Sequence, residues 1–175
     1  MKFEKMPAGT NPPETVTCIV EVPKQCSNKF EYDEEYELFR LDRVLHSPLF
    51  YPCDYGFIPA TRSDDGDHLD VLIIVTIPSF TGAVIECRPV GMLKMTDDKG
   101  RDMKILAVPK GDPRFKHVYD LPHLSEHVLA EIRHFFEIYK TLEKKMVNVE
   151  GWEGADAAKA EILRSMELYQ SEQRH

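Results

Sequence analysis

The chain has 175 residues, with 22 lysine and arginine against 30 aspartate and glutamate residues, which gives a net charge of −8 at pH 7. This length suits one domain with its own core, and the negative charge argues against nucleic acid as a partner. No window approaches 18 apolar residues, no signal peptide is recognisable, and the four cysteines are widely spaced. We therefore expect no membrane partner, no disulfide or zinc framework, and a cytoplasmic location.

Strand-like segments dominate the first two thirds of the chain. Residues 1–13 are rich in proline, glycine and polar residues, and we expect them to form a loosely held arm of a single domain, 1–175. Apolar residues alternate through residues 15–22, so that Glu21 lies on one face and the other face carries Val16, Cys18, Val20 and Val22. Further strands are expected at residues 29–32, 37–45, 70–77, 83–95 and 104–108. Turn residues between them are typical of a compact β-barrel or sandwich.

The last third of the chain has helical periodicity. Ser125 is suited to cap a helix, whose apolar residues would be Val128, Leu129, Ile132, Phe135, Phe136, Tyr139 and Leu142. A second helix is predicted at about residues 156–169, with an apolar side made of Ala158, Ile162, Leu163, Met166 and Tyr169. Residues 151–154 are interpreted as the turn between the two helices. Strands followed by helices indicate an α+β fold, with the helices packed on a small barrel.

The most informative segment is the acidic stretch 65–70, which runs directly into an apolar strand. Asp65, Asp67 and Asp70 bring three carboxylates into six positions. If the chain is extended there, Asp65 and Asp67 point the same way, because side chains alternate along a strand. Carboxylates held together need a compensating positive charge, and Mg²⁺ and Ca²⁺ prefer oxygen ligands. The register does not fit an EF-hand loop. A solvated acidic turn stays open as the alternative.

A second acidic segment, residues 97–104, follows a similar logic. Gly100 predicts a hairpin turn, flanked by Asp97 and Asp102, which would then converge. Alternation also places Asp102 and Lys104 on one face of the outgoing strand. A carboxylate beside a lysine suits a metal–phosphate complex, because one group holds the cation and the other the anion. Two such acidic groups suggest a multi-metal site, with a plain charged hairpin as the alternative.

Three further residue types fit a phosphate-binding site. Lys29 and Glu31 repeat the pairing of opposite charges two positions apart, and Arg43 suits bidentate phosphate recognition. Tyr51 and Tyr55 would offer phenolic donors to phosphate oxygens. Each of these features has an ordinary alternative, which is a surface ion pair for the charged residues and core packing for the tyrosines.

The order of several motifs resembles that of the soluble family I inorganic pyrophosphatases. The acidic stretch 65–70 resembles the signature of that family, and the P-loop, nucleophile-elbow and His-Glu-x-x-His motifs are absent from the sequence. The resemblance runs from about residue 13 to 165 and includes residues 21–24, 28–31, 41–45, 50–56, 88–91, 94–98, 134–136, 139–140 and 149–153. The short chain is similar to the bacterial and archaeal branch. This resemblance implies a compact five-stranded OB-like β-barrel with two C-terminal helices packed on it, usually in a homohexamer.

The resemblance also implies an activity. The chain would be an inorganic diphosphatase that hydrolyses inorganic pyrophosphate, bound as its magnesium complex, to two phosphates. A metal-activated water would attack directly, without a covalent enzyme intermediate. Three to four Mg²⁺ ions would take part in each active site, counting those that arrive with the substrate, and Mn²⁺ or another divalent ion could replace them.

The family's functional residues can be placed on matching positions of this chain. Asp67 would be the general base. The metal ligands would be Asp65, Asp70, Asp97, Asp102, Glu31 and Glu21, with the two glutamates acting directly or through water. The phosphoryl groups would be bound by Lys29, Arg43, Tyr55, Lys104, Tyr139 and Lys140. Of these, Lys29, Arg43 and Tyr55 are also expected to take part in catalysis, and Tyr51 would tune a site carboxylate.

Three positions depart from the family pattern. His68 stands where proline is usual, and we expect it to loosen the loop or to add a titratable neighbour. Asp98 stands where glutamate is common, which shortens that acid by one methylene. Arg101 places a positive charge inside the second acidic segment, where we expect it to weaken the third metal site.

Two other functions are weighed against this interpretation. One is a different two-metal phosphohydrolase, acting on nucleotides or phosphate esters. The other is a non-catalytic barrel, either a calcium-binding module or an oligonucleotide-binding fold. The EF-hand mismatch and the net charge of −8 argue against the second.

Overall fold

A closed ring of five strands forms the centre of the molecule. The computed structural model describes residues 3–174. The ring consists of β1 (Val16–Val22), β4 (Asp54–Ile58), β5 (Leu69–Ile73), β7 (Gly100–Pro109) and β6 (Val84–Asp97), in that order, and pairing of β6 with β1 closes it. Strand β8 (Val147–Gly154) extends the sheet from β6. The predicted five-stranded barrel is therefore confirmed, and its likeness to an OB fold stays a prediction.

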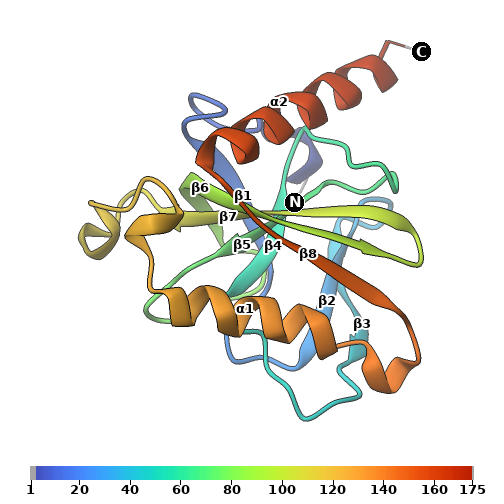
Figure 1. Cartoon of the computed structure of the whole chain (residues 1–175). Coiled ribbons are helices and arrows are strands. Elements are labelled where there is room, and N and C mark those ends of the chain that lie inside the picture. Colours follow the sequence, from blue (N-terminus) through green and yellow to red (C-terminus); the bar gives the residue numbers. More distant parts are fainter. Residues whose placement is uncertain (1–2, 175) are drawn as a thin grey trace.

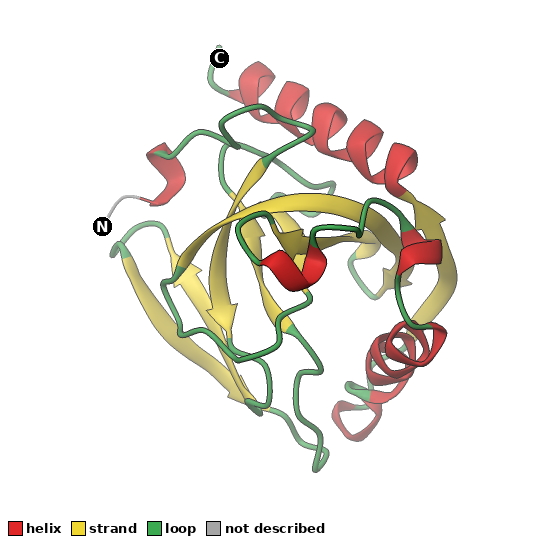
Figure 2. Ribbon diagram, turned by 90° about the vertical axis from the view of Figure 1, so that its left-hand side faces the viewer, coloured by secondary structure: helices red, strands yellow, loops and turns green. Residues whose placement is uncertain are grey.

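Two helices and a separate hairpin surround the ring. Helix α1 (Glu126–Ile138) lies below the strands in Figure 1 and α2 (Ala155–Glu172) lies above them, which Figure 2 shows from another side. Strands β2 (Asn28–Asp33) and β3 (Leu38–Val44) form the hairpin. Short 3₁₀ turns complete the elements at Phe3–Lys5, Pro113–Phe115, Leu121–His123 and Thr141–Glu143. Within residues 3–174, no helix is long and apolar enough to span a membrane.

The ring strands have two apolar faces, and each helix covers one of them. On β7, Leu106 packs in a cluster with Phe136 of α1, whereas its neighbour Ile105 packs in a second cluster with Ile162 of α2. Side chains alternate along a strand, so consecutive residues of one strand enter different cores. Strands buried on both faces are expected to be almost continuously apolar, as residues 105–109 of β7 are.

Strand β1 differs from its predicted alternation at one point. All seven of its residues are buried, because both of its faces are covered. The register with β4 shifts between Val20 and Val22, which leaves Glu21 as the extra residue of a bulge. Val22 consequently packs in a different cluster from Val20, so placing it on the same face was wrong. The bulge redirects the chain, and no residue pattern announces it.

Two strands were missed by the sequence prediction, and one turn was misplaced. Strand β4 has only five residues, with Gly56 at its centre, and β8 lacks a clear apolar alternation. Residues 151–154, predicted as a turn between helices, belong to β8 and pair with β6. Tertiary pairing decides these segments, because strand propensity depends strongly on the neighbouring strand.

Some predicted boundaries also changed. Helix α1 ends at Ile138, and Leu142 is exposed in the 3₁₀ turn that follows. On α2, Leu163 is also largely exposed, and Glu161 and Ser165 are buried instead. Strand β5 ends at Ile73, before the exposed Ile77.

The first residues of the described chain make more contacts than a loosely held arm would. Phe3 is buried, with its ring centroid 5.3 Å from that of Tyr32 and 5.4 Å from that of Phe39. The carbonyl of the buried Ala8 accepts a hydrogen bond from Thr17 N. Phe3 supplies the apolar surface that anchors this segment, which a composition dominated by proline and glycine does not reveal.

We expect Gly56→Ala to destabilise the protein by about 3 kcal/mol or more. A Cβ atom at this position would lie 1.8 Å from the carbonyl oxygen of Ile19, so β1 and β4 would have to separate. Gly111→Ala is the matched control, because nothing lies within 4 Å of the added carbon. Its stability should stay within about 0.5 kcal/mol of the original. Urea unfolding of both variants measures the difference, and equal midpoints would contradict the role of Gly56.

Candidate active site

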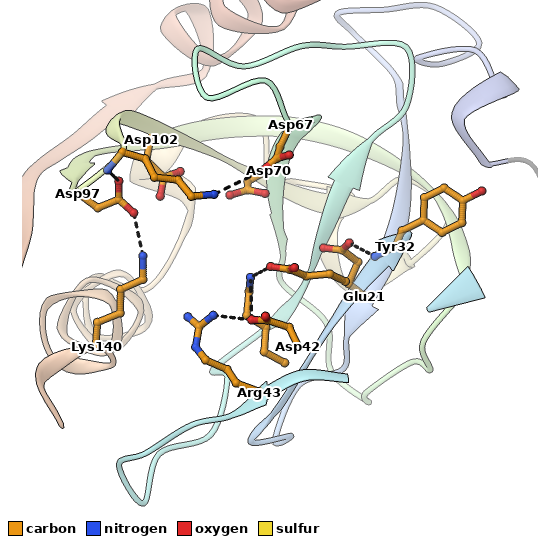
Figure 3. Close-up of polar contacts among 12 residues, drawn as sticks. Glu21, Tyr32, Asp42, Arg43, Asp67, Asp70, Asp97, Asp102 and Lys140 are labelled. Carbon is orange, nitrogen blue, oxygen red and sulfur yellow. Dashed lines mark hydrogen bonds and ion pairs between the residues drawn. The ribbon is translucent and has the colours of Figure 1, made fainter. Parts of the chain in front are cut away.

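One open cavity of about 360 Å³ gathers every residue that was predicted to belong to the active site. Its walls come from β1, the β2–β3 hairpin, β4, the loop before β5, the β6–β7 hairpin and the segment after α1 (Figure 3). The residues with predicted roles that line it are Glu21, Lys29, Glu31, Arg43, Tyr55, Asp65, Asp67, Asp70, Asp97, Asp102, Lys104, Tyr139 and Lys140. Segments far apart in sequence therefore meet around one space.

The segment that precedes β5, residues 62–68, is here called the acidic loop, and it forms a turn rather than an extended segment. A carboxylate oxygen of Asp65 accepts a hydrogen bond from Asp67 N at 3.1 Å, and Gly66 has a φ of 92°. The prediction that the Asp65 and Asp67 side chains point the same way assumed an extended backbone. The turn replaces that extended backbone, so the reason for the prediction does not hold. Burial raises the pKa of Asp67, and repulsion from Asp65 adds to this shift. Asp67 thus has a carboxylate of raised basicity at the rim of the cavity.

The side chain of Lys104 lies between carboxylates of the two acidic segments. Its ammonium is 2.7 Å from Asp70 and 2.9 Å from Asp102, and the residue is only 2% exposed. Parallel pairing of β5 with β7 sets Asp70 beside Lys104, and alternation along β7 sets Asp102 on the same face. Burial alone would lower the pKa of Lys104, but the two carboxylates outweigh it and hold the pKa well above its usual value. Lys104 is therefore a fixed positive charge.

The β6–β7 hairpin brings the second acidic group into the cavity. Gly100, with a φ of 116°, lies at its turn, as predicted. Asp97 is paired with Lys140, whose ammonium lies 2.8 Å from its carboxylate (Figure 3). Burial opposes the shift, but this ammonium and the Lys99 amide hold the pKa of Asp97 below its usual value. Burial raises the pKa of Asp102, against the attraction of Lys104.

The β2–β3 hairpin supplies the cations of the opposite wall. Arg43 donates from Nε to Glu143 at 3.0 Å and from Nη1 to Asp42 at 2.6 Å. Lys29 pairs closely with Glu31 and lies 3.8 Å from Asp42. The register of the hairpin shifts between Lys29 and the next residue, which makes Asp42 the bulged residue of β3. This bulge is why neighbouring residues 42 and 43 both reach the cavity.

Glu21 is the most deeply buried of the predicted metal ligands. It is 8% exposed and accepts a hydrogen bond from Tyr32 N at 2.8 Å (Figure 3). Burial raises its pKa to about 8, against the effect of this hydrogen bond, and repulsion from Asp70 adds to the increase. Glu21 is therefore largely protonated at neutral pH when no cation faces it.

Buried tyrosines form the floor of the cavity. Tyr51, Tyr55 and Tyr139 are each at most 6% exposed, and the Tyr51 and Tyr55 rings are 5.4 Å apart. Burial raises the pKa of Tyr51 and of Tyr55 well above the usual value. Both phenols stay neutral at physiological pH and keep a proton to donate.

The three positions that depart from the family pattern all line the cavity, and two of them make contacts that the sequence did not predict. Arg101 does not sit among the second group of carboxylates, because it alternates with Asp102 on β7 and its guanidinium binds Glu161 of α2 at 2.7 and 2.9 Å. His68 does not loosen the loop, since its ring stacks on Phe57 and its Nδ1 lies 2.9 Å from a carbonyl oxygen. Asp98 is in the hairpin turn and lines the cavity.

Two residues of the site were missed by sequence reasoning. Asp42 belongs to one of the motifs that resemble the family, residues 41–45, but no role was predicted for it. Alternation along a regular strand would have placed its side chain on the face opposite to that of Arg43. Glu143, with a side chain only 5% exposed, holds Arg43 from the 3₁₀ turn after α1. The two residues of this pair are 100 positions apart, so no local signal reveals it.

The donor set of the cavity fits a hard divalent cation. Among residues 3–174, no three acidic, histidine or cysteine side chains are arranged to hold a metal ion as they stand. All the same, the lining carboxylates are oxygen donors, and burial raises the pKa of Asp67 and Asp102, with repulsion from neighbouring carboxylates adding to both shifts. Such groups gain from an added divalent charge, and oxygen ligands are those that Mg²⁺ prefers.

Comparisons with known proteins place the chain in a family. The model of the inorganic pyrophosphatase family matches residues 18–170. An inorganic pyrophosphatase of Methanosarcina acetivorans is 52% identical over 83% of this chain and 86% of its own, and one of Escherichia coli O6:H1 is 47% identical over 95% and 97%. The crystal structure of inorganic pyrophosphatase from Thermus thermophilus has a TM-score of 0.94 at 43% identity, covering 97% of this chain and 99% of that one. Archaeal and bacterial relatives, the matching fold and the motif order agree: this chain belongs to the inorganic pyrophosphatase family.

Proposed function

We propose that this chain hydrolyses inorganic pyrophosphate, bound as its magnesium complex, to two phosphates by direct attack of a water molecule. The observation that carries the proposal is one cavity in which carboxylates of the acidic loop and β7 face Lys29, Arg43 and Lys140. Carboxylates suit Mg²⁺, whereas lysine and arginine suit phosphoryl oxygens. The names of the relatives support pyrophosphate as the substrate.

The metal ligands in this proposal are the carboxylates of the cavity. Asp65, Asp70 and Asp102 would hold two Mg²⁺ ions, and Asp97 with Asp102 would hold a further ion that arrives with the substrate. Glu21 and Glu31 would act directly or through water, with three to four Mg²⁺ or Mn²⁺ ions in all. When bound, such ions lower the pKa of a water molecule and offset the negative charge of phosphoryl oxygens.

Binding of the substrate would exchange charge partners rather than leave charges unpaired. Lys29, Arg43 and Lys140 each pair with a carboxylate. When phosphoryl oxygens enter, these cations can turn to them while the carboxylates turn to the divalent ions. The exchange avoids the cost of a buried charge without a partner, which reaches several kcal/mol.

The reaction itself would use Asp67 and the donors on the opposite wall. The Asp67 carboxylate, of raised pKa, would accept the proton of the attacking water. Negative charge that develops on the phosphoryl oxygens would be stabilised by Lys29, Arg43, Lys104 and Lys140, together with the phenols of Tyr55 and Tyr139.

We also propose that residues 1–175 form one cytoplasmic domain that assembles into a homo-oligomer, a hexamer by analogy with the family. The chain exposes several large apolar side chains, and an assembly would cover those that lie together, because monomers rarely expose large contiguous apolar patches. The most exposed are Met146, Ile77, Phe80, Tyr36, Phe50 and Leu142. No nucleic acid or membrane partner is part of this proposal.

Asp67→Asn should lower the turnover of pyrophosphate by on the order of 10²–10⁴, because the amide cannot accept the proton of the attacking water. Phosphate release is measured with Mg²⁺ and with a chelator. Asp156→Asn, an exposed carboxylate of α2 outside the cavity, is the matched control and should keep full turnover. Near-normal turnover of the Asp67 variant would rule out this base.

The same assay separates the alternative functions. Hydrolysis of pyrophosphate should exceed that of ATP and of a phosphomonoester under equal conditions. Faster hydrolysis of ATP or of the monoester would favour a different two-metal phosphohydrolase. A folded protein without any Mg²⁺-dependent turnover would favour a non-catalytic barrel.

Lys29→Ala should raise the KM for pyrophosphate roughly 10- to 100-fold, as expected for loss of one charged contact. Mg²⁺ binding, measured by calorimetry without substrate, should be retained, because lysine cannot ligate a cation. Lys159→Ala is the control, since its ion pair with Glu14 lies outside the cavity. An equal loss of metal and substrate binding would contradict the assignment of Lys29.

Glu21→Gln should gain stability relative to the original chain as the pH rises, when both are kept metal-free with a chelator. The pKa of Glu21 is about 8 in the folded chain against 4.5 for an ordinary glutamate, so folding takes up a proton between these values. Stability of the original chain is therefore lost as the pH rises through this window, by at most about 5 kcal/mol. Urea unfolding from pH 5 to 9 measures the free energy of unfolding of both chains. The value for Glu21→Gln minus that for the original chain should increase with pH, and a constant difference would contradict the raised pKa.

A further inference from the structure

A cluster of ion pairs connects helix α2 to both acidic segments of the cavity. Arg101 of β7 binds Glu161 of α2 through two N–H groups, at 2.7 and 2.9 Å. Arg164, one turn further along α2, donates to the same carboxylate at 3.1 Å and pairs closely with Asp64. Arg101 also lies 3.4 Å from Asp64. Two guanidinium groups and two carboxylates thus join β7, α2 and the acidic loop.

Each end of the cluster is adjacent in sequence to a proposed metal ligand. Arg101 precedes Asp102 on β7, and because side chains alternate, the two leave the strand on opposite faces. Asp102 binds Lys104, whereas the Arg101 guanidinium reaches Glu161 of α2 and also lines the cavity. Asp64 precedes Asp65 in the acidic loop. The cluster therefore fixes the backbone of one metal-ligating segment relative to the backbone of the other, without any of its members being a ligand.

Other contacts hold the same loop on α2. Arg62 N donates to the carbonyl of Ser165 at 2.8 Å, and the Arg62 side chain binds both Glu172 and the carbonyl of Gly66. The turn itself is closed by hydrogen bonds from Ser63 N to the Asp67 carbonyl and from Gly66 N to the Ser63 carbonyl. Helix α2 thus supports the outer side of the loop whose inner side lines the cavity.

One buried member distinguishes this cluster from an ordinary surface ion pair, although the side chains of Arg101, Arg164 and Asp64 are 35–42% exposed. Glu161 is 6% exposed, so its charge depends on the two guanidinium groups, whereas exposed pairs contribute little. The hydrogen bond from Arg164 lowers the pKa of Asp64, and the hydrogen bond to Glu161 raises the pKa of Arg101. A two-pronged contact between arginine and carboxylate also fixes orientation, which a single lysine contact would do less well.

We propose that Arg101, Glu161 and Arg164 are positioning residues, which hold the acidic loop and the β6–β7 hairpin in register so that their carboxylates can share divalent cations. This inference rests on the proposed metal-dependent function. It assigns a supporting role to Arg101, which was predicted from the sequence only to weaken a metal site. Holding the loop in place before the metal binds reduces the ordering cost of binding.

The test compares Arg101→Gln, Glu161→Gln and the double variant with the full original chain. Mg²⁺ and Mn²⁺ binding is measured by calorimetry without substrate. Amide hydrogen exchange of residues 62–69 is measured in the metal-free protein. We expect the single variants to bind the metal roughly 10-fold more weakly, as for residues that orient ligands from outside the coordination sphere. The amides of Gly66 and Asp67 should exchange faster, while those of the ring strands stay unchanged.

Two further variants, together with the double variant, separate positioning from general stability. The double variant should lose less metal affinity than the two single losses combined, because both changes break the Arg101–Glu161 contact. Each single change also removes a second contact, which is Asp64 for Arg101 and Arg164 for Glu161. Arg101→Lys should restore part of the metal affinity. Arg133→Gln removes an exposed ion pair with Glu137 on α1 and is the matched control, with unchanged metal affinity and loop exchange.

Two results would overturn the positioning role. One is unchanged metal affinity and loop exchange in folded Arg101→Gln. The other is faster exchange throughout the ring strands, which would show that the cluster only stabilises the fold. Failure of the proposed function is recognised separately, because the original chain would then neither bind Mg²⁺ nor hydrolyse pyrophosphate. The loop-exchange comparison would still decide whether Arg101 holds the loop.

Discussion

Repulsion among carboxylates in one cavity is the constraint on which this structure depends. Without a metal ion, the acidic loop and the β6–β7 hairpin would be driven apart, and Lys104 prevents this by binding Asp70 and Asp102 from a nearly inaccessible position. The ammonium of Lys104 can neutralise both carboxylates at once, because it is a compact charge with three hydrogen-bond donors. The same constraint explains why Arg43 and Lys140 are each paired with a carboxylate.

The closed ring of strands fixes the positions of these carboxylates and of Lys104 relative to one another. Parallel pairing of β5 with β7 sets Asp70 opposite Lys104 by register, and the hairpin between β6 and β7 carries Asp97 and Asp102 to the same mouth. Carboxylates on ring strands can be held more firmly than those on a free loop. The acidic loop is the part that lacks strand pairing, and α2 supports it from outside through Arg62 and Asp64.

Local irregularities of the strands have functional consequences. The bulge in β1 turns Glu21 toward the cavity, and the bulge in β3 lets Asp42 and Arg43 face the same way. The sequence did not predict either bulge, since each depends on which partner strand is paired and at what register. For the same reason β4 and β8 were missed, and the Arg43–Glu143 pair has no local signal. The contact of Arg101 with Glu161 of α2 was not predicted either, because no local pattern shows which helix packs beside β7.

The sequence by itself determined the family, the β-barrel with two helices, and most of the charged residues that line the cavity. Side-chain chemistry at short spacing indicated the two acidic segments, and the ordered resemblance to the family supplied the other site residues. Only the tertiary structure decided which charges pair before substrate binds, how deeply Glu21 and Lys104 are buried, and that α2 reaches the acidic loop. These properties depend on distances between segments far apart in the chain, which arise only when the ring of strands closes.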